Sequence, residues 1–373
     1  MKAVIMAGGF GTRLRPLTAH LPKPLLPVWN VPIMEHVVRL LRQHGFTDLM
    51  VLLYFLPDTI MSHFGDGSRW GVRIDYFTPP ADLGTAGAVR YAAGHLTEPF
   101  LVISGDILTD FDLKAVVAFH GERRSLATMV LTRVESPIQY GIVITDEEGR
   151  ITRFLEKPTW GEVFSDTINT GIYLLDPSVL EAIPPQRAYD FGKEFFPARL
   201  ASGEPLYGHV AEGYWRDIGD LVEYRLAQLD LLQGKIRAEI PGRKIEGSPG
   251  NLWLEESARV DFTARLVGAV IVGAGARVEP GARVADSVIG PNVIIREAAE
   301  VQGSVLWEGA EVGAGAVIKE AVVGRHAVVK ARAFVAEGVV VGDFSKIGES
   351  SVVKANVKGW PYKEVEDGAT LAV

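Results

Sequence analysis

The chain has 373 residues, of which 47% are hydrophobic and 23% charged, a composition typical of folded, water-soluble proteins. This length exceeds what one hydrophobic core normally supports, so we expect two domains. The net charge of −8 argues against a general nucleic-acid binder, and the longest apolar run, Leu49–Leu56, is too short to span a membrane. The absence of cysteine excludes disulfides and thiolate chemistry and is compatible with a reducing compartment, so we expect a cytoplasmic protein.

Residues 1–235 alternate short apolar runs with helical patterns, which predicts an α/β domain with a Rossmann-like, mainly parallel sheet and helices on both faces. The segment at 141–158 reads as a hairpin that turns at Glu148 and Gly149, so we also expect some antiparallel pairing. The predicted strands are 2–7, 49–55, 72–77 and 100–104, and the predicted helices are 32–45 and 85–95.

The second half follows a different period. Residues 236–253 are rich in proline, glycine and charge and are predicted to form a linker. From 254 to 357 an aliphatic residue returns every six positions with small residues between, which is typical of a parallel β-helix built from hexapeptide repeats. Eighteen such positions at three per coil predict about six coils. Residues 358–373 are expected to be a C-terminal tail.

The segment "MAGGFGTRLRPLTAHLPKPLLP" at residues 6–27 follows the first predicted strand, where ligands bind in open α/β sheets. Its glycines let backbone N–H groups approach an anion, and Arg13, Arg15 and Lys23 add positive charge. This combination suits a polyphosphate, although a glycine turn with basic surface residues is the alternative. The spacing matches neither the dinucleotide-binding motif nor the P-loop.

Residues 8–18 and 22–24 match the G-G-x-G-T-R-L-x-P-L-T and P-K-P motifs of the sugar-1-phosphate nucleotidyltransferases at every specified position. The sequence thus resembles this family, many members of which carry a C-terminal left-handed β-helix, so left-handedness is an expectation from the resemblance. The family joins a sugar 1-phosphate to a nucleoside triphosphate by in-line attack and releases pyrophosphate. Such catalysis depends on positioning and charge neutralisation.

By this resemblance Arg13 stabilises charge on the phosphates and Lys23 contacts them. The segment "DLGTAGAV" at 82–89 matches the part that meets the base and is most like the version in guanylyltransferases that use mannose 1-phosphate. Asp82 would accept hydrogen bonds from the N–H and amino groups of guanine. The resemblance implies these nucleotide-binding residues: Ala7, Gly8, Gly9, Gly11, Thr12, Asp82, Gly84 and Thr85.

Two aspartates match the metal-binding positions of the family: Asp106 in "ISGD" and Asp217 in "YWRDIGD". Two carboxylates that leave room for water and phosphate oxygens suit Mg²⁺, the expected cofactor. For the sugar phosphate, the resemblance implies Gly141 in "YGIV", Glu156 and Lys157 in "FLEKP", and Asn169 and Thr170 in "INTGIY". Lys157 would hold the phosphate and Glu156 the sugar hydroxyls. Alone, these residues would fit a solvated hairpin end and a strand-edge turn equally well.

Other readings stay open. Glucose 1-phosphate uridylyl or thymidylyl transfer is one alternative, and a catalytically silent regulatory subunit is another. Acyl transfer in the β-helix would need a histidine, and His326 is the only one in that half. The β-helix is instead expected to support a homo-oligomer. Asp220 replaces a threonine common in the family and is expected to begin the next helix as its N-cap.

Overall fold

The structure is a computed structural model that describes residues 1–245 and 250–372. It divides into two compact units, each described here by itself. The first unit contains Met1–Phe10 and Met34–Asp217, and the second contains Gly11–Ile33 and Ile218–Val373. In the part of the chain that is described, no helix is long and apolar enough to cross a membrane.

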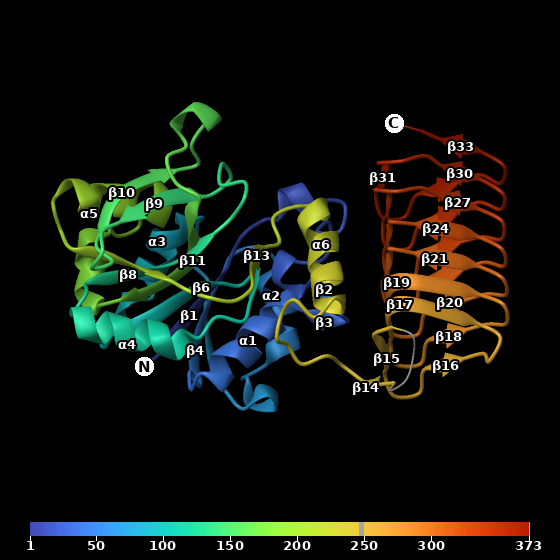
Figure 1. Ribbon diagram of the computed structural model, residues 1–373, viewed down its shortest axis with the longest axis horizontal. Helices are drawn as coiled ribbons and strands as arrows, with labels where there is room; N and C mark the ends of the chain where they lie inside the picture. The colour runs from blue at the N-terminus through green and yellow to red at the C-terminus, as the bar shows by residue number, and fades with distance from the viewer. Residues whose placement is uncertain (246–249, 373) are drawn as a thin grey trace. The chain divides into compact units, whose positions relative to one another are not determined.

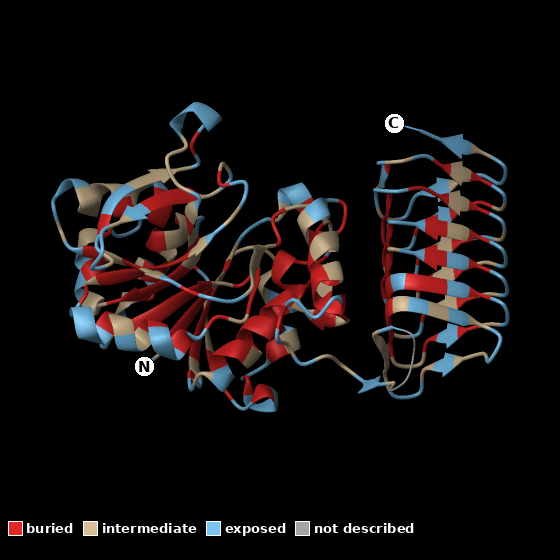
Figure 2. Ribbon diagram, in the orientation of Figure 1, coloured by how far each residue is buried: buried red, intermediate tan, exposed pale blue. Residues whose placement is uncertain are grey.

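The first unit is built on a nine-stranded mixed sheet whose main path is β10-β9-β11-β6-β1-β4-β5 (Figure 1). The four strands at one end are parallel: β5 (Arg73–Phe77), β4 (Asp48–Leu53), β1 (Ala3–Ala7) and β6 (Phe100–Ser104). The apolar runs of β1, β4 and β6 are buried (Figure 2), as expected for strands that are covered on both faces, whereas only Ile74 of the edge strand β5 is buried. The predicted Rossmann-like α/β sheet is confirmed, and each of these strands begins within two residues of its predicted start.

Antiparallel strands complete the sheet. The predicted hairpin is present as β9 (Gly141–Thr145) and β10 (Ile151–Glu156), and its turn is closed by the bond from Gly149 N–H to the Asp146 carbonyl at 3.0 Å. Strand β11 (Thr167–Leu175) runs antiparallel to β6 and to β8 (Ala127–Arg133), which pairs in turn with β12 (Leu206–Val210). A separate two-stranded sheet joins β7 (Ile107–Thr109) to β13 (Trp215–Asp217).

Helices of the first unit pack on this sheet. They are α1 (Ile33–Gln43), α2 (Pro57–Phe64), α3 (Gly84–Tyr91), α4 (Leu113–Arg123) and α5 (Phe196–Ala201). The first residue of α1, Ile33, is assigned to the second unit. Helix α3 shares one buried cluster with Phe191, Phe195 and Phe196 and with strand residues such as Val4 and Val102. The base-binding segment expected at 82–89 therefore lies on the same sheet face as the turn before α5.

The second unit contains the parallel β-helix. One of its sheets stacks seven short strands, in which paired residues are 17 or 18 positions apart. In spatial order they are β16 (Arg259–Val260), β18 (Arg277–Val278), β20 (Ile294–Ile295), β23 (Glu311–Val312), β26 (Val328–Val329), β29 (Lys346–Ile347) and β32 (Glu364–Val365). The aliphatic residues of the hexapeptide repeats form one buried cluster in its interior, because each coil turns one of them inward per side. Figure 2 shows buried positions that recur from coil to coil.

The prediction that residues 358–373 form a C-terminal tail is wrong, because the described residues of this segment continue the β-helix. Residues from 358 onward form β31 (Lys358–Gly359), β32 and β33 (Thr370–Leu371), which pair in parallel with the preceding coil. The described strands thus give seven layers rather than six. The coil persists with fewer aliphatic residues because backbone ladder bonds, such as Val352 N–H to the Ala369 carbonyl at 2.8 Å, do not depend on side-chain type.

The predicted linker also differs in part. Strand β14 (Arg243–Lys244) pairs with β15 (Leu252–Leu254), and β15 continues into the β-helix by pairing with β17 (Arg265–Val272). Residues 246–249 of the linker lie outside the described residues. The boundary between units falls at Asp217 rather than near 235, because helix α6 (Leu221–Leu232) belongs with the second unit.

Contacts inside the second unit explain this boundary. Tyr224 of α6 donates its hydroxyl to the Pro27 carbonyl at 2.6 Å and accepts a bond from the Trp307 indole N–H at 2.9 Å. Gln228 accepts from the Trp29 backbone N–H at 2.9 Å. Asn30 Nδ2 donates to the Ile289 carbonyl at 3.1 Å. Helix α6 and residues 27–30 are therefore bonded both to each other and to the β-helix.

Candidate active site

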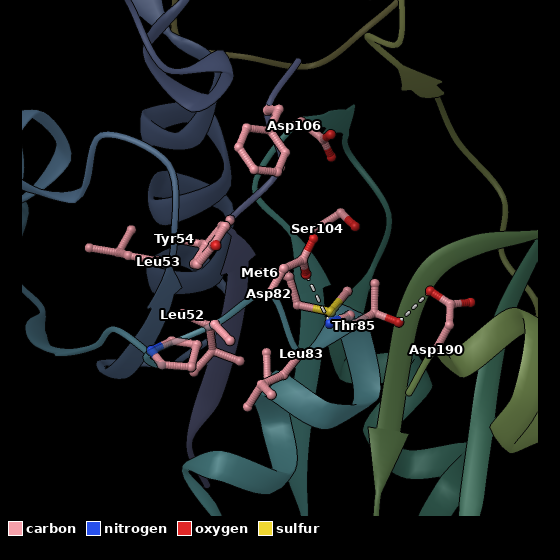
Figure 3. Close-up of a pocket in the computed structure, with 17 residues that line it drawn as sticks. Met6, Leu52, Leu53, Tyr54, Asp82, Leu83, Thr85, Ser104, Asp106 and Asp190 are labelled. Atoms are coloured by element: carbon pink, nitrogen blue, oxygen red, sulfur yellow. Dashed lines mark hydrogen bonds between the residues drawn. The ribbon is translucent and has the colours of Figure 1, made fainter. Parts of the chain in front are cut away.

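A pocket of about 250 Å³ opens at the carboxyl end of β1, within the first unit (Figure 3). Ligands of α/β sheets bind at such strand ends. Its lining combines the end of β1, the segment before α3 and the end of β6, three regions far apart in sequence. The lining residues of polar or glycine type are Gly8, Gly9, Tyr54, Asp82, Gly84, Thr85, Ser104, Asp106 and Asp190.

The two glycines that follow β1 differ in their surroundings. A Cβ atom at Gly8 would lie 3.2 Å from the Cβ of Tyr54, so packing favours glycine there. A Cβ at Gly9 would meet no described atom within 4 Å, and the backbone φ of Gly9 lies outside the positive range. Neither packing nor backbone strain therefore accounts for glycine at position 9, which lines the pocket.

The segment at 82–89, which is predicted to meet the base, lines another part of the same pocket. Asp82 Oδ1 accepts the Gly84 N–H at 3.0 Å, so one carboxylate oxygen shapes the turn into α3 (Figure 3). The side chain of Asp82 is exposed. Gly84 adopts φ +66°, and a Cβ there would be 2.9 Å from the Tyr189 carbonyl oxygen. Glycine at 84 is thus required by conformation and by the close approach of residue 189.

The two predicted metal ligands lie at adjacent positions of the small sheet. Asp106 directly precedes β7, and Asp217 ends β13, where it stands opposite Ile107 in antiparallel register. Directly paired residues have Cα atoms about 5 Å apart, so the register brings the backbone of Asp217 close to the residue that follows Asp106. Asp106 also lines the pocket. Strand pairing therefore brings together residues that are 111 positions apart (217 − 106) in the sequence.

This donor set fits a hard divalent cation. No group of three or more acidic, histidine or cysteine residues forms a metal cluster among the described residues. A pair of carboxylates completed by water and phosphate oxygens is the usual protein contribution to a Mg²⁺ site. Asp106 and Asp217 are the residues that would hold it.

Glu156 and Gly141 are brought together by the hairpin. Glu156 is the last residue of β10 and pairs with Gly141 of β9. A Cβ at Gly141 would lie 2.6 Å from Glu156 Oε2, so the carboxylate rests directly against this glycine. Burial raises the pKa of Glu156; Lys157 and Lys193 lower it, while the charge of Asp190 raises it further. The carboxyl group therefore sits in a partly dehydrated site with charged neighbours on two segments.

Lys157 follows Glu156 and is exposed. It adopts φ +48°, and its N–H donates to the Tyr140 carbonyl at 3.1 Å. A left-handed conformation is uncommon for lysine and is tolerated where the surroundings hold the backbone in place. The turn thus directs the Lys157 side chain away from the path of strand β10.

Asn169 and Thr170 fall on an irregularity of β11, where the register with β8 shifts between Asn169 and Tyr173. Asn169 Nδ2 donates to the Tyr173 hydroxyl at 3.0 Å, and Asn169 Oδ1 accepts the Gly171 N–H. Thr170 is buried, and its hydroxyl donates to the Val130 carbonyl at 2.7 Å. The hydroxyl of Thr170 therefore has a structural role, while the side chain of Asn169 lies beside the hydroxyl of Tyr173.

Four of the remaining predicted residues, Gly11, Thr12, Arg13 and Lys23, belong to the second unit. Gly11 adopts φ +61° and begins the short helix η1 (Thr12–Leu14), which contains Thr12 and Arg13. Lys23 is buried at the start of η2 (Lys23–Leu25). Ala7, the last residue of β1, belongs to the first unit. The contribution of Gly11, Thr12, Arg13 and Lys23 to the pocket remains a prediction from the motif.

Sequence reasoning missed Asp190 and Tyr54. Asp190 accepts the Thr85 hydroxyl at 2.9 Å and precedes Glu194 by four residues. Aspartate is a preferred N-cap residue, and this preference could have identified the turn that Asp190 begins, although not its bond to Thr85.

His326 occupies an exposed corner of the β-helix. Its φ is +52°, and its ring stacks on Phe344 at 5.3 Å between centroids. Gly309 of the preceding coil lies so close to the ring that a Cβ there would be 2.3 Å from Nδ1. These contacts describe a packed corner residue.

Comparisons with known proteins agree with both units. Residues 2–234 match the family described as "Nucleotidyl transferase", and residues 249–353 match the "EIF2B subunit epsilon LbH domain". The chain therefore belongs to the nucleotidyl transferase family. The second match confirms the expected left-handed β-helix.

Relatives of known name define the class of enzyme within this family more closely. The chain is 38% identical over 325 residues to a UTP–glucose-1-phosphate uridylyltransferase of Synechocystis, covering 83% of each chain. It is 35% identical over 302 residues to a mannose-1-phosphate guanylyltransferase of Mycobacterium tuberculosis (80% of this chain, 82% of the relative). A mannose-1-phosphate guanylyltransferase of Arabidopsis thaliana is 33% identical over 314 residues (82% and 86%). The predicted class, a sugar-1-phosphate nucleotidyltransferase, is confirmed.

A solved structure agrees with this class. A Bacillus anthracis protein, provisionally assigned as a glucose-1-phosphate thymidylyltransferase, aligns with a TM-score of 0.57 and 29% identity. It covers 64% of this chain and 97% of its own length.

Proposed function

We propose that this enzyme transfers a guanylyl group from GTP to mannose 1-phosphate, forming GDP-mannose and pyrophosphate. The observation that carries the proposal is the single pocket shared by the glycines after β1, the segment Asp82–Thr85 and the metal candidate Asp106. Relatives named mannose-1-phosphate guanylyltransferase support the substrate pair. A uridylyltransferase for glucose 1-phosphate is the second candidate, favoured by the Synechocystis relative.

In the proposed reaction a phosphate oxygen of the sugar 1-phosphate attacks the α-phosphorus of GTP in line. The bond to the β-phosphate oxygen breaks, and pyrophosphate leaves with that electron pair. Mg²⁺ held by Asp106 and Asp217 would neutralise phosphate charge when bound. Backbone N–H groups at Gly8 and Gly9 would bind phosphate oxygens, and Arg13 and Lys23 would supply further positive charge.

The sugar phosphate would bind beside the hairpin end. Lys157 would pair with its phosphate, and the Glu156 carboxylate would accept hydrogen bonds from sugar hydroxyls. Asn169 would contribute a further polar contact. This assignment is supported by the partly dehydrated position of Glu156 against Gly141, which strengthens hydrogen bonds to a ligand.

We further propose that the enzyme is cytoplasmic and a homo-oligomer that associates through the β-helix. The last layer leaves one ladder edge of β31, β32 and β33 without a further described strand. Such edges favour pairing with another chain unless they are covered.

The base preference is tested by Asp82→Asn. Asparagine keeps an oxygen for the Gly84 N–H, so the turn is retained, while the carboxylate that would face guanine is lost. We expect the preference for GTP over UTP to fall at least ten-fold, measured as the ratio of kcat/KM values. An unchanged ratio with full activity would contradict the role of Asp82. The exposed Asp58 at the start of α2, changed to Asn, is the control and should leave the ratio unaltered.

A further inference from the structure

Within the first unit, residues 187–195 connect the base-binding segment to Glu156. Tyr189 N–H donates to the Leu83 carbonyl at 2.9 Å, and Gly87 N–H donates to the Tyr189 carbonyl at 3.0 Å. The glycines of the base-binding segment permit this approach, since a Cβ at Gly87 would be 2.7 Å from the Arg187 carbonyl oxygen. The backbone of 187–189 is therefore fixed to the start of α3.

Asp190 extends this connection through its side chain. Its Oδ2 accepts the Thr85 hydroxyl at 2.9 Å, as Figure 3 shows, and Thr85 Oγ1 accepts the Phe191 N–H at 2.9 Å. Its Oδ1 accepts the N–H groups of Gly192 at 2.9 Å and Lys193 at 3.0 Å. One carboxylate therefore binds α3 with one oxygen and caps the turn η7 (Phe191–Phe195) with the other.

The capped turn touches the proposed sugar site. A Cβ at Gly192 would lie 2.6 Å from Glu156 Oε2 and 2.8 Å from its Cδ, so the turn backbone forms one wall around this carboxylate. Gly141 forms another wall at the same 2.6 Å. A shift of η7 would move a surface against which Glu156 rests, and close-packed surfaces transmit such shifts.

We propose that Asp190 is a positioning residue that couples the nucleotide pocket to the sugar-phosphate site, by tying Thr85 of the base-binding segment to the turn that supports Glu156. This inference rests on the proposed assignment of Glu156 to the sugar. Its effect is on sugar-phosphate affinity: with Thr85 and Asp190 joined, the turn holds Glu156 in its binding position.

Two substitutions weaken the connection: Asp190→Ser removes the bond between Asp190 and Thr85, whereas Thr85→Val removes this bond and also the acceptor of the Phe191 N–H. Asp190→Ser keeps a cap for η7, because serine is a good N-cap, but its single short side-chain oxygen cannot also bind Thr85. Thr85→Val removes the hydroxyl with little change of shape, and Thr85→Ser restores it. Asp190→Ala removes both the cap and the connection and serves as the structural reference.

The assay is pyrophosphate release by the full chain, using the pair with highest turnover among GTP, UTP, dTTP or ATP and mannose or glucose 1-phosphate. We expect Asp190→Ser and Thr85→Val each to raise the KM for the sugar 1-phosphate at least five-fold. The double variant should be no worse than Thr85→Val alone, because Thr85→Val already removes the bond to Asp190. Thr85→Ser keeps the hydroxyl and should restore the sugar 1-phosphate KM that Thr85→Val impairs.

The charge of Asp190 gives a second readout. Lys157, Lys193, Asp190 and the Tyr173 hydroxyl surround Glu156, and removal of the Asp190 charge removes one cause of its raised pKa. The acid limb of kcat/KM for the sugar 1-phosphate should therefore move to lower pH in Asp190→Ser, but not in Thr85→Val.

The outcomes separate the two proposals. Additive losses in the double variant, or equal rises in the KM values for nucleotide and sugar 1-phosphate with an unmoved acid limb, would overturn the coupling role. In those cases the wild type still turns over. If the wild type releases no pyrophosphate with any substrate pair, the proposed function itself fails. Thermal unfolding of each variant verifies that the variant is folded.

Discussion

At Gly9 the chain has a glycine where the fold does not require one. A side chain there would meet no described atom, in contrast to Gly84, where both φ and the Tyr189 carbonyl demand glycine. A residue free of structural constraint at a pocket edge is best explained by the ligand that approaches it.

We expect Gly9→Ala to raise the KM for the nucleoside triphosphate at least ten-fold, because the added methyl group obstructs the approach of a phosphate to the backbone N–H. The thermal unfolding midpoint should stay within about 1 °C of the wild type, since the substitution neither clashes nor strains the backbone. Gly161→Ala is a matched control, as Gly161 also has open surroundings and lies outside the pocket lining. An unaltered KM in Gly9→Ala would count against phosphate binding at this loop.

Glu156 shows the cost of placing a carboxylate in a partly dehydrated site. Burial raises its pKa above the ordinary 4.5, so the ionised form is less favourable in the folded state than in the unfolded chain. Stability is therefore lost as the pH rises from the unfolded-state pKa through the folded-state pKa. A functional site commonly carries such a cost.

We expect Glu156→Gln to raise the unfolding midpoint at pH 8, where the wild-type carboxylate is ionised. The gain should shrink as the pH falls and vanish below about pH 4, where Glu156 is protonated in both states. The same variant should lose sugar-phosphate affinity. Thermal unfolding followed from pH 3.5 to pH 8 measures the first effect, and a gain that is independent of pH would refute this explanation.

At the scale of elements, helix α6 begins at an aspartate where the family motif commonly has threonine. Asp220 Oδ1 accepts the N–H groups of Val222 and Glu223, each at 2.9 Å, which confirms the predicted N-cap. The cap matters beyond the helix, because Tyr224 and Gln228 bind the backbone of residues 27–29.

Replacement of Asp220 by Ala should lower the free energy of unfolding by about 1 kcal/mol, the usual value of a lost N-cap. Asp220→Thr should retain most of the stability, because the threonine hydroxyl accepts the same bonds. Chemical unfolding of both variants, followed by circular dichroism, distinguishes them. Equal destabilisation by Ala and Thr would show that the carboxylate acts by a route other than capping.

Elements with a strong pattern were predictable from sequence, and those set by long-range pairing were not. The runs at β1 and β6 and the hexapeptide repeats carry their own periodicity, so their positions followed directly. Strands β7 and β13 have three residues each, too few for a pattern, and only their pairing brings Asp217 beside Asp106. The motif named both aspartates, but their adjacency required the fold.

The coils at 358–373 were missed for a related reason. They have Gly359 where the preceding coil has Val341, which interrupts the hexapeptide period, although Val365 and Leu371 continue it opposite Ile347 and Val353. Asp190 was missed because its role depends on Thr85, a hydroxyl 105 residues away. Side-chain connections of this kind leave no local sequence signal.

At the scale of the whole molecule, the two units do not divide at the expected boundary. Residues 11–33, which include Arg13 and Lys23, are bonded to α6 and to the β-helix, for example through Asn30 and the Ile289 carbonyl. The β-helix therefore supports the segment that carries the family signature, in addition to the assembly role proposed for it.

The central claim is the reaction and its substrates, and pyrophosphate release tests it most directly. The assay crosses GTP, UTP, dTTP and ATP with mannose 1-phosphate and glucose 1-phosphate, with Mg²⁺ and with a chelator. We predict that release is greatest with GTP and mannose 1-phosphate and is lost with the chelator. A maximum with UTP and glucose 1-phosphate would contradict the proposed specificity, and no release with any pair would contradict the proposed catalytic function.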